Sequence, residues 1–149
     1  MPHADHRGPA KVRGCTCLRL RKASRRVSQI YDQHLEPFGL TVTQYGVLGH
    51  LVTFAGIGIG ELAEKLVMDP TTLTRNLRPL QRQGLLAVKT DRRDRRARSL
   101  ELTAHGHKVF ERAKPGWVRA QQQVEELFGE RETPALNAVL DRVLERLAR

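Results

Sequence analysis

Residue types and runs that mark secreted or membrane proteins are scarce in this 149-residue sequence. It has two cysteines, and aromatic residues make up 5% of the chain. Two cysteines do not build a disulfide scaffold, and Cys15 and Cys17 are too close in sequence for an easy bridge. Apolar runs such as Val47-Leu48-Gly49 are far shorter than the roughly 20 residues that cross a bilayer. No charged start leads into an apolar stretch, so we expect a cytoplasmic protein without a secretory signal or a membrane partner.

Motifs of catalysis and of metal binding are missing as well. The sequence has no Gly-rich phosphate loop, no Gly-x-Ser-x-Gly elbow and no His-Glu-x-x-His pair. The pairs His105-x-His107 and Cys15-x-Cys17 lack the second spaced pair that a zinc site needs. We therefore expect a protein that is not an enzyme and that holds no metal and no cofactor.

Positive charge is abundant and unevenly distributed. The chain has 26 Lys and Arg against 16 Asp and Glu, which gives a formal net charge of +10. Residues 1–26 carry eight basic residues and one acidic residue, and residues 75–98 carry nine basic and two acidic residues. The segment between them is acidic overall. Two concentrated basic segments are typical of a surface that binds a polyanion, although a solvated surface face can also be this basic.

Apolar periodicity and turn residues predict a mainly α fold with a small β-hairpin wing, namely a winged helix-turn-helix domain plus a helical dimerisation region. Gly56, Gly58 and Gly60 predict a loop, and Pro115 should kink or divide a long helix. We expect a flexible basic arm at residues 1–14, a helical dimerisation region at 15–40 and 104–149, and a DNA-binding domain at 41–103. The expected elements are helices near 16–37, 41–51, 60–67, 70–83, 103–128 and 133–148, with strands at 85–89 and 97–102.

The helix expected near 70–83 has the features of a recognition helix. Asp69 can cap its N-terminus and Pro70 suits its first position. Leucines at positions 73, 77 and 80 share one face, so the opposite face is exposed. A helix fits the major groove, where arginine and short polar side chains contact base edges. The side chains expected to contact DNA from this helix are Thr71, Thr72, Arg75, Asn76 and Arg78.

Between the two predicted strands lies the block Asp91-Arg92-Arg93-Asp94-Arg95-Arg96. An arginine at the tip of a thin loop can enter a narrow minor groove, where negative potential is concentrated. We expect Arg93, Arg95 or Arg96 to contact DNA in this way. Taken alone, the block is also compatible with a soluble turn that pairs aspartate with arginine.

Four segments resemble the multiple-antibiotic-resistance regulator (MarR) family: Leu62-Ala63-Glu64-Lys65-Leu66, residues 71–77, Gln83-Gly84-Leu85-Leu86, and residues 91–96 followed by Leu100-Glu101-Leu102-Thr103. The resemblance covers about residues 15–148 in the same element order. It implies a homodimer formed by the first and last helices that binds an imperfect palindrome in double-stranded DNA. It also implies a transcriptional regulator, usually a repressor, that is relieved by a small aromatic or phenolic ligand or by oxidation.

Two groups of residues are candidates for sensing. Cys15 and Cys17 open the first helix beside basic residues, where a thiol can react with oxidants. Cys17 and Tyr31 are placed similarly to the reactive cysteine and one tyrosine of the hydroperoxide-sensing branch, but Val42 stands near the position of the second tyrosine. Both cysteines can equally be small packing residues. Candidates for a ligand pocket are His34, Tyr45, His50 and Trp117, which can also serve only in packing.

Two other classes of protein remain open at this point. One is an architectural protein that binds DNA without sequence preference and without an effector, whose affinity would be nearly independent of sequence. The other is a small ligand-binding or thiol-active protein whose charge is incidental, which would show no affinity for DNA at physiological salt.

Overall fold

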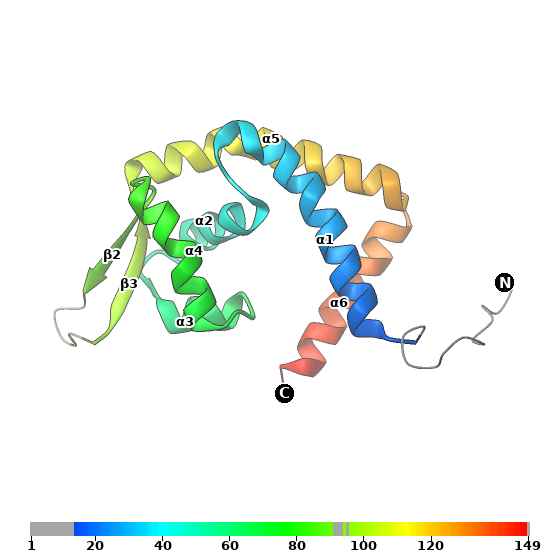
Figure 1. The fold of residues 1–149 in the computed structure, drawn as a ribbon, viewed down its shortest axis with the longest axis horizontal. Coiled ribbons are helices and arrows are strands. Elements are labelled where there is room, and N and C mark those ends of the chain that lie inside the picture. The colour runs from blue at the N-terminus through cyan, green and yellow to red at the C-terminus, as the bar shows by residue number, and fades with distance from the viewer. Residues whose placement is uncertain (1–13, 91–93, 95, 149) are drawn as a thin grey trace, which may run out of the picture. The chain divides into compact units, whose positions relative to one another are not determined.

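The computed structural model describes residues 14–90, 94 and 96–148, and these belong to two compact units. One unit comprises residues 31–122, and the other comprises residues up to 30 together with those from 123 onward. The expected arm, apart from Gly14, and Arg93 and Arg95 of the wing lie outside the described residues. The elements, in chain order, are α1 (Thr16–Leu35), η1 (Glu36–Phe38), α2 (Val42–Thr53), β1 (Ile57–Gly58), α3 (Ile59–Lys65), α4 (Pro70–Arg82), β2 (Leu86–Thr90), β3 (Arg98–Leu102), α5 (Ala104–Phe128) and α6 (Glu132–Leu147) (Figure 1).

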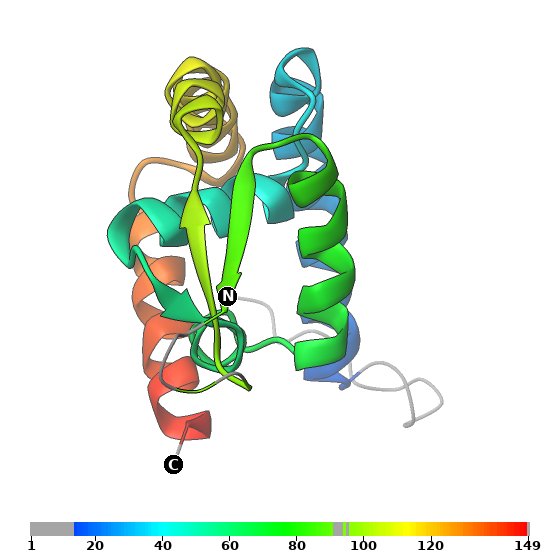
Figure 2. The ribbon, with the colours of Figure 1, turned by 90° about the vertical axis from the view of Figure 1, so that its left-hand side faces the viewer.

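The unit of residues 31–122 contains a three-stranded antiparallel sheet in the order β1-β3-β2. In the β2–β3 hairpin Leu86 pairs with Leu102 and Thr90 pairs with Arg98. The predicted mainly α fold with a β-hairpin wing is thereby confirmed. The sequence did not predict β1, which lies beside β3 with Ile57 opposite Leu100 (Figure 2). Glycines on both sides of Ile57 suggested a loop, and this strand exists only because β3 offers it a hydrogen-bonding edge.

Local sequence signals determine where the second helix of the helix-turn-helix begins and ends. Asp69 is the N-cap of α4, as predicted, and its Oδ2 accepts hydrogen bonds from the backbone N–H groups of Thr71 and Thr72 at 3.0 and 3.2 Å. Pro70 occupies the first turn, where its missing N–H costs nothing. At the other end of α4, Gly84 adopts a φ of +70° and stops the helix. These caps fix where the exposed face of α4 begins and ends.

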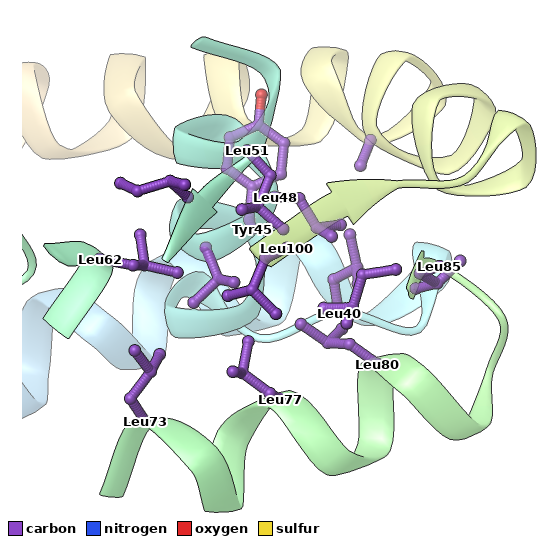
Figure 3. Close-up of a cluster of buried hydrophobic side chains, with 14 of the residues drawn as sticks. Leu40, Tyr45, Leu48, Leu51, Leu62, Leu73, Leu77, Leu80, Leu85 and Leu100 are labelled. Carbon is purple, nitrogen blue, oxygen red and sulfur yellow. The ribbon is translucent and has the colours of Figure 1, made fainter. Parts of the chain in front are cut away.

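Leucines hold α4 against the rest of this unit. Leu73 and Leu80 are fully buried and Leu77 is nearly so, and all three point from α4 into the core that contains Leu48 and Leu100 (Figure 3). Complete burial of one leucine side chain stabilises a fold by about 1.5–3 kcal/mol. The spacing of these residues by four and three positions places them on one side of the helix. The opposite side of α4 must therefore face solvent.

Of the two outcomes expected at Pro115, a kink or a division, the structure excludes division, because α5 continues from Ala104 to Phe128. The next residue, Gly116, lies at a close contact. A Cβ atom at Gly116 would lie 2.6 Å from the carbonyl oxygen of His34 and 2.8 Å from the ring of Phe38. The backbone of α5 therefore approaches the end of α1 so closely that only glycine fits at this position.

The other unit has few buried side chains. Among its described residues only Val124 and Thr133 are buried, and the hydroxyl of Thr133 donates to the carbonyl oxygen of Gly129 at 2.9 Å. Its large exposed apolar residues lie on the first turns of α1, the end of α5 and along α6: Leu18, Leu20, Leu127, Phe128, Leu136, Val139, Val143, Leu144 and Leu147. In the part of the chain that the structure describes, no helix is long and apolar enough to span a membrane.

Two helical glycines give a matched test of packing. A Cβ atom at Gly106 would lie 1.9 Å from the carbonyl oxygen of Leu85, whereas one at Gly46 would meet no atom within 4 Å. We expect Gly106→Ala to lower the free energy of unfolding by about 1–3 kcal/mol through overcrowding. Gly46→Ala should raise it by about 0.5–1 kcal/mol, because alanine favours the helix. Urea unfolding at one protein concentration measures both, and equal stability of the two variants would contradict this account.

Candidate functional site

The exposed face of α4 carries the polar and basic side chains that the sequence predicts for DNA contact. Its core face is apolar, as described above, so these side chains are concentrated on one surface. Arginines follow one another along the exposed side of the helix, at positions 75, 78 and 82. Of the predicted contacts, Thr71, Thr72, Arg75 and Arg78 are exposed and Asn76 is half-buried.

Asn76 differs from its neighbours because its side chain is turned back onto the protein. Its Nδ2 atom donates to the carbonyl oxygen of Thr72 at 3.0 Å and lies 3.9 Å from the sulfur of Met68. The nitrogen of this amide would therefore have to give up a hydrogen bond within the protein in order to donate one to a base. The four exposed side chains of α4 have no such requirement, since within the described part of the chain no hydrogen bond ties them to the protein.

The wing is organised by Asp94. Its Oδ1 accepts from the backbone N–H of Arg96 at 2.9 Å, and its carbonyl oxygen accepts from the N–H of Ala97 at 3.0 Å. This is an Asx-type turn that leads the chain into β3. Arg96 and Arg98 are both exposed. The predicted contacts Arg93 and Arg95 lie outside the described residues.

A cavity of about 380 Å³ lies between α2 and α5 within the unit of residues 31–122. The structure places three of the four sequence candidates around it, namely Tyr45, His50 and Trp117. His34 does not line it. The complete lining is Tyr45, Gly46, Gly49, His50, Thr53, Phe54, Lys114 and Trp117. The sequence did not single out the other lining residues, among them Phe54 and Lys114, because the candidates were chosen as polar aromatic residues and not by helical spacing from one another.

Aromatic rings form the walls of this cavity. The ring of Tyr45 stacks on Phe110 with centroids 4.8 Å apart, and it is nearly parallel to the ring of Trp117 at 6.3 Å. Burial, and secondly the charge of Glu111, raise the pKa of Tyr45 above its ordinary value. The phenol is therefore neutral at physiological pH. Such walls favour a flat aromatic guest, and Lys114 and His50 supply polar groups at its edge.

One wall of the cavity also touches the helix-turn-helix. The ring of Phe54 lines the cavity, and the Nζ atom of Lys65 in α3 lies 4.4 Å from the centroid of that ring. A cation over an aromatic face at this distance is attracted to it. Lys65 is also 4.0 Å from a carboxylate oxygen of Glu61 in the same helix. The side chain of Phe54 thus contacts both the cavity and the helix that precedes α4.

Both cysteines are free and exposed in the described chain. Cys15 precedes α1, and its sulfur accepts the backbone N–H of Leu18 at 3.4 Å. The packing alternative therefore does not describe them within a single chain. Tyr31, which resembles a partner of the sensing cysteine in the hydroperoxide-sensing branch, hydrogen-bonds through its hydroxyl to Oε1 of Gln121. In the described residues, no cluster of three or more metal-ligating side chains occurs.

The order α2-β1-α3-α4-β2-β3 defines a winged helix-turn-helix protein, with α4 as the second helix of the motif and the β2–β3 hairpin as the wing. The family model of the MarR family matches residues 38–97, which cover these elements up to the wing. Together with the likeness to solved structures described next, this match shows that the chain belongs to the MarR family of winged helix-turn-helix transcriptional regulators.

Three similar proteins illustrate the family. The transcriptional regulator MosR of M. tuberculosis, solved in complex with DNA, is 33% identical with a TM-score of 0.80, over 89% of this chain and 96% of MosR. The transcriptional repressor CouR, solved on a 23-mer DNA duplex, is 27% identical with a TM-score of 0.80, over 88% and 93% of the two chains. The transcriptional activatory protein BadR of Rhodopseudomonas palustris is 32% identical over 76% of this chain, which spans only 63% of BadR. All three relatives are described as regulators of transcription.

Proposed function

We propose that this protein is a homodimeric transcriptional repressor that binds a palindromic site in double-stranded DNA. The observation that carries the proposal is the exposed face of α4, where Thr71, Thr72, Arg75 and Arg78 stand opposite three buried leucines. Arginine binds guanine in the major groove through two hydrogen bonds, and we assign this role to Arg75. The structures of the similar proteins MosR and CouR in complex with DNA support this assignment. Since chromosomal DNA is the partner, we expect the protein to act in the cytoplasm.

The wing supplies the second contact in this proposal. Arg96 is exposed at the start of the hairpin's return strand, and Arg93 and Arg95 stand beside it in the sequence. We propose that the hairpin reaches the minor groove next to the major groove that α4 occupies. Phosphate and minor-groove contacts of arginine add affinity that depends little on base sequence and strongly on salt. The two surfaces therefore have different signatures in a binding experiment.

Dimerisation is proposed from the unit of residues up to 30 and from 123 onward. Nine large apolar residues of this unit are exposed, and only two of its described residues are buried. Along α6 they recur at spacings of three and four, which is one continuous face. A second copy of the same chain offers a matching face, because a two-fold interface brings identical patches together. Two copies would then present two α4 helices to half-sites about 34 Å apart.

We further propose that a flat aromatic ligand with a hydroxyl or acid group occupies the cavity and releases the DNA. Tyr45 and Trp117 provide nearly parallel ring faces, and Lys114 can pair with a negative group. Phe54 links the cavity to Lys65 of α3, so a guest that displaces this ring disturbs the helix-turn-helix. The sequence suggested two triggers, namely a small ligand and thiol oxidation. The cavity supports the ligand, whereas oxidation of Cys15 or Cys17 stays a prediction.

Selection of bound duplexes from a random pool gives the site, and fluorescence anisotropy then compares it with a scrambled duplex. We expect Arg75→Ala to lose about 1–3 kcal/mol of discrimination between the two. Arg96→Ala should weaken binding to both duplexes evenly and reduce the salt slope by about 1. Arg142→Ala, which removes an equal charge from α6, is the control and should bind as the native protein does. If the native protein binds both duplexes equally, it is an architectural protein without sequence preference.

Sedimentation velocity tests the proposed dimer. Leu144 is 52% exposed on the apolar face of α6, and Leu144→Glu would place an unpaired charge in the interface. We expect the dissociation constant of the dimer to rise at least about tenfold, with a parallel loss of DNA affinity. Ala138→Glu adds the same charge to the opposite face of α6 and should leave the dimer intact. A native protein that sediments as a monomer at micromolar concentration would disprove the dimer.

Trp117 is the single tryptophan of the chain, so its fluorescence reports on the cavity directly. Phenol, benzoate and 4-hydroxybenzoate serve as probes. We expect the best probe to quench Trp117 and to lower DNA affinity in the native protein and in Gly46→Ala. Gly46→Leu fills the cavity from a position that has open space, so this variant should bind DNA but respond to no probe. An equal response of Gly46→Leu and the native protein would place the ligand elsewhere.

A further inference from the structure

The turn between α3 and α4 contains a backbone conformation that its residue disfavours. Val67 has a φ of +50°, and among the residues that the structure describes no other residue except glycine has a positive φ. For a β-branched side chain this region is a genuine outlier, because Cβ lies too close to the backbone. Its side chain is 79% exposed, the largest value among the exposed large apolar residues of the described chain.

The conformation at Val67 is imposed by the end of α3. The N–H of Met68 donates to the carbonyl oxygen of Ala63 at 2.8 Å, and the N–H of Val67 donates to that of Glu64 at 3.1 Å. These two bonds form a Schellman motif, in which the residue after the C-cap is left-handed and is usually glycine. Met68 packs against the core, as the motif requires. The fold therefore requires a left-handed backbone conformation at residue 67, but it gains no packing from the valine side chain.

Nothing in the described chain compensates for this choice of residue. Leu66 and Met68, on either side, pack against the core, whereas the valine side chain faces solvent. It stands two residues before Asp69, the cap of α4, and next to the exposed residues that open the recognition helix. Val67 is strained and its side chain is not buried. Strained residues are common at functional sites, so this one indicates contact with another molecule.

We propose that Val67 is a DNA contact, and that its methyl groups pack on apolar atoms of the duplex beside the groove that α4 enters. This inference rests on the proposed function. Apolar atoms of DNA that a valine can reach are the 5-methyl group of thymine and the carbons of deoxyribose. Burying one valine side chain there removes apolar surface from water and adds affinity without a hydrogen bond.

Val67→Gly separates this role from a structural one, because glycine relieves the strain and removes only the exposed methyl groups. We expect its melting temperature to equal or exceed that of the native protein, with an unchanged circular dichroism spectrum. Its affinity for the selected duplex should fall about three- to tenfold. Val52→Ala, at a valine of α2 that is 41% exposed, is the control and should keep native affinity.

Duplexes with uracil in place of each thymine identify the atoms that Val67 meets. If thymine is the partner, one uracil substitution weakens the native protein but not Val67→Gly. If deoxyribose is the partner, no uracil substitution distinguishes the two proteins, while the loss in Val67→Gly remains. Native affinity in Val67→Gly, with weakened binding in Arg75→Ala, overturns the inference and leaves the proposed function intact. A native protein that binds no duplex overturns both.

Discussion

The burial of Leu73, Leu77 and Leu80 is the constraint on which the function of this fold depends. These side chains fix the rotation of α4 about its own axis, so the side that carries Thr71, Thr72 and Arg75 has to face outward. Caps at Asp69 and Gly84 fix the helix along its length. A recognition surface needs both, because base edges in a groove are read at defined positions. The chemistry of the surface is thus set by residues that never touch DNA.

The two units differ in how much of their apolar surface they bury. Residues 31–122 bury enough leucine to form a core of their own. The described residues up to 30 and from 123 onward leave most of their large apolar side chains in water, and a monomeric protein rarely exposes so much apolar surface. In the proposed dimer, association of two chains would cover these side chains and would at the same time pair the two α4 helices. The two-fold symmetry of that dimer would then match the symmetry of a palindromic site.

Local signals made much of this structure predictable. An N-cap, a proline at the first helical position, leucines at helical spacing and a glycine stop gave α4 within a residue or two. The resemblance to the MarR family followed from four short sequence segments in the helix-turn-helix and the wing. Non-local features were missed. Strand β1 depends on the edge of β3, and the close contact at Gly116 depends on the end of α1 lying against α5. Phe54 and Lys114 meet at the cavity only after the chain has folded. The strain at Val67 is likewise invisible until the turn is built.

The cavity and α4 belong to the same compact unit, and this bears on how a ligand would act. A ligand shifts an equilibrium only by the difference between its affinities for two states. In the mechanism proposed above, Phe54 would provide such a difference, because its ring both lines the cavity and contacts Lys65. A guest that needs this ring moved would bind better to a state in which α3 has lost that contact. By reciprocity, DNA that favours the intact contact would oppose the guest. A single aromatic side chain would then couple the two sites.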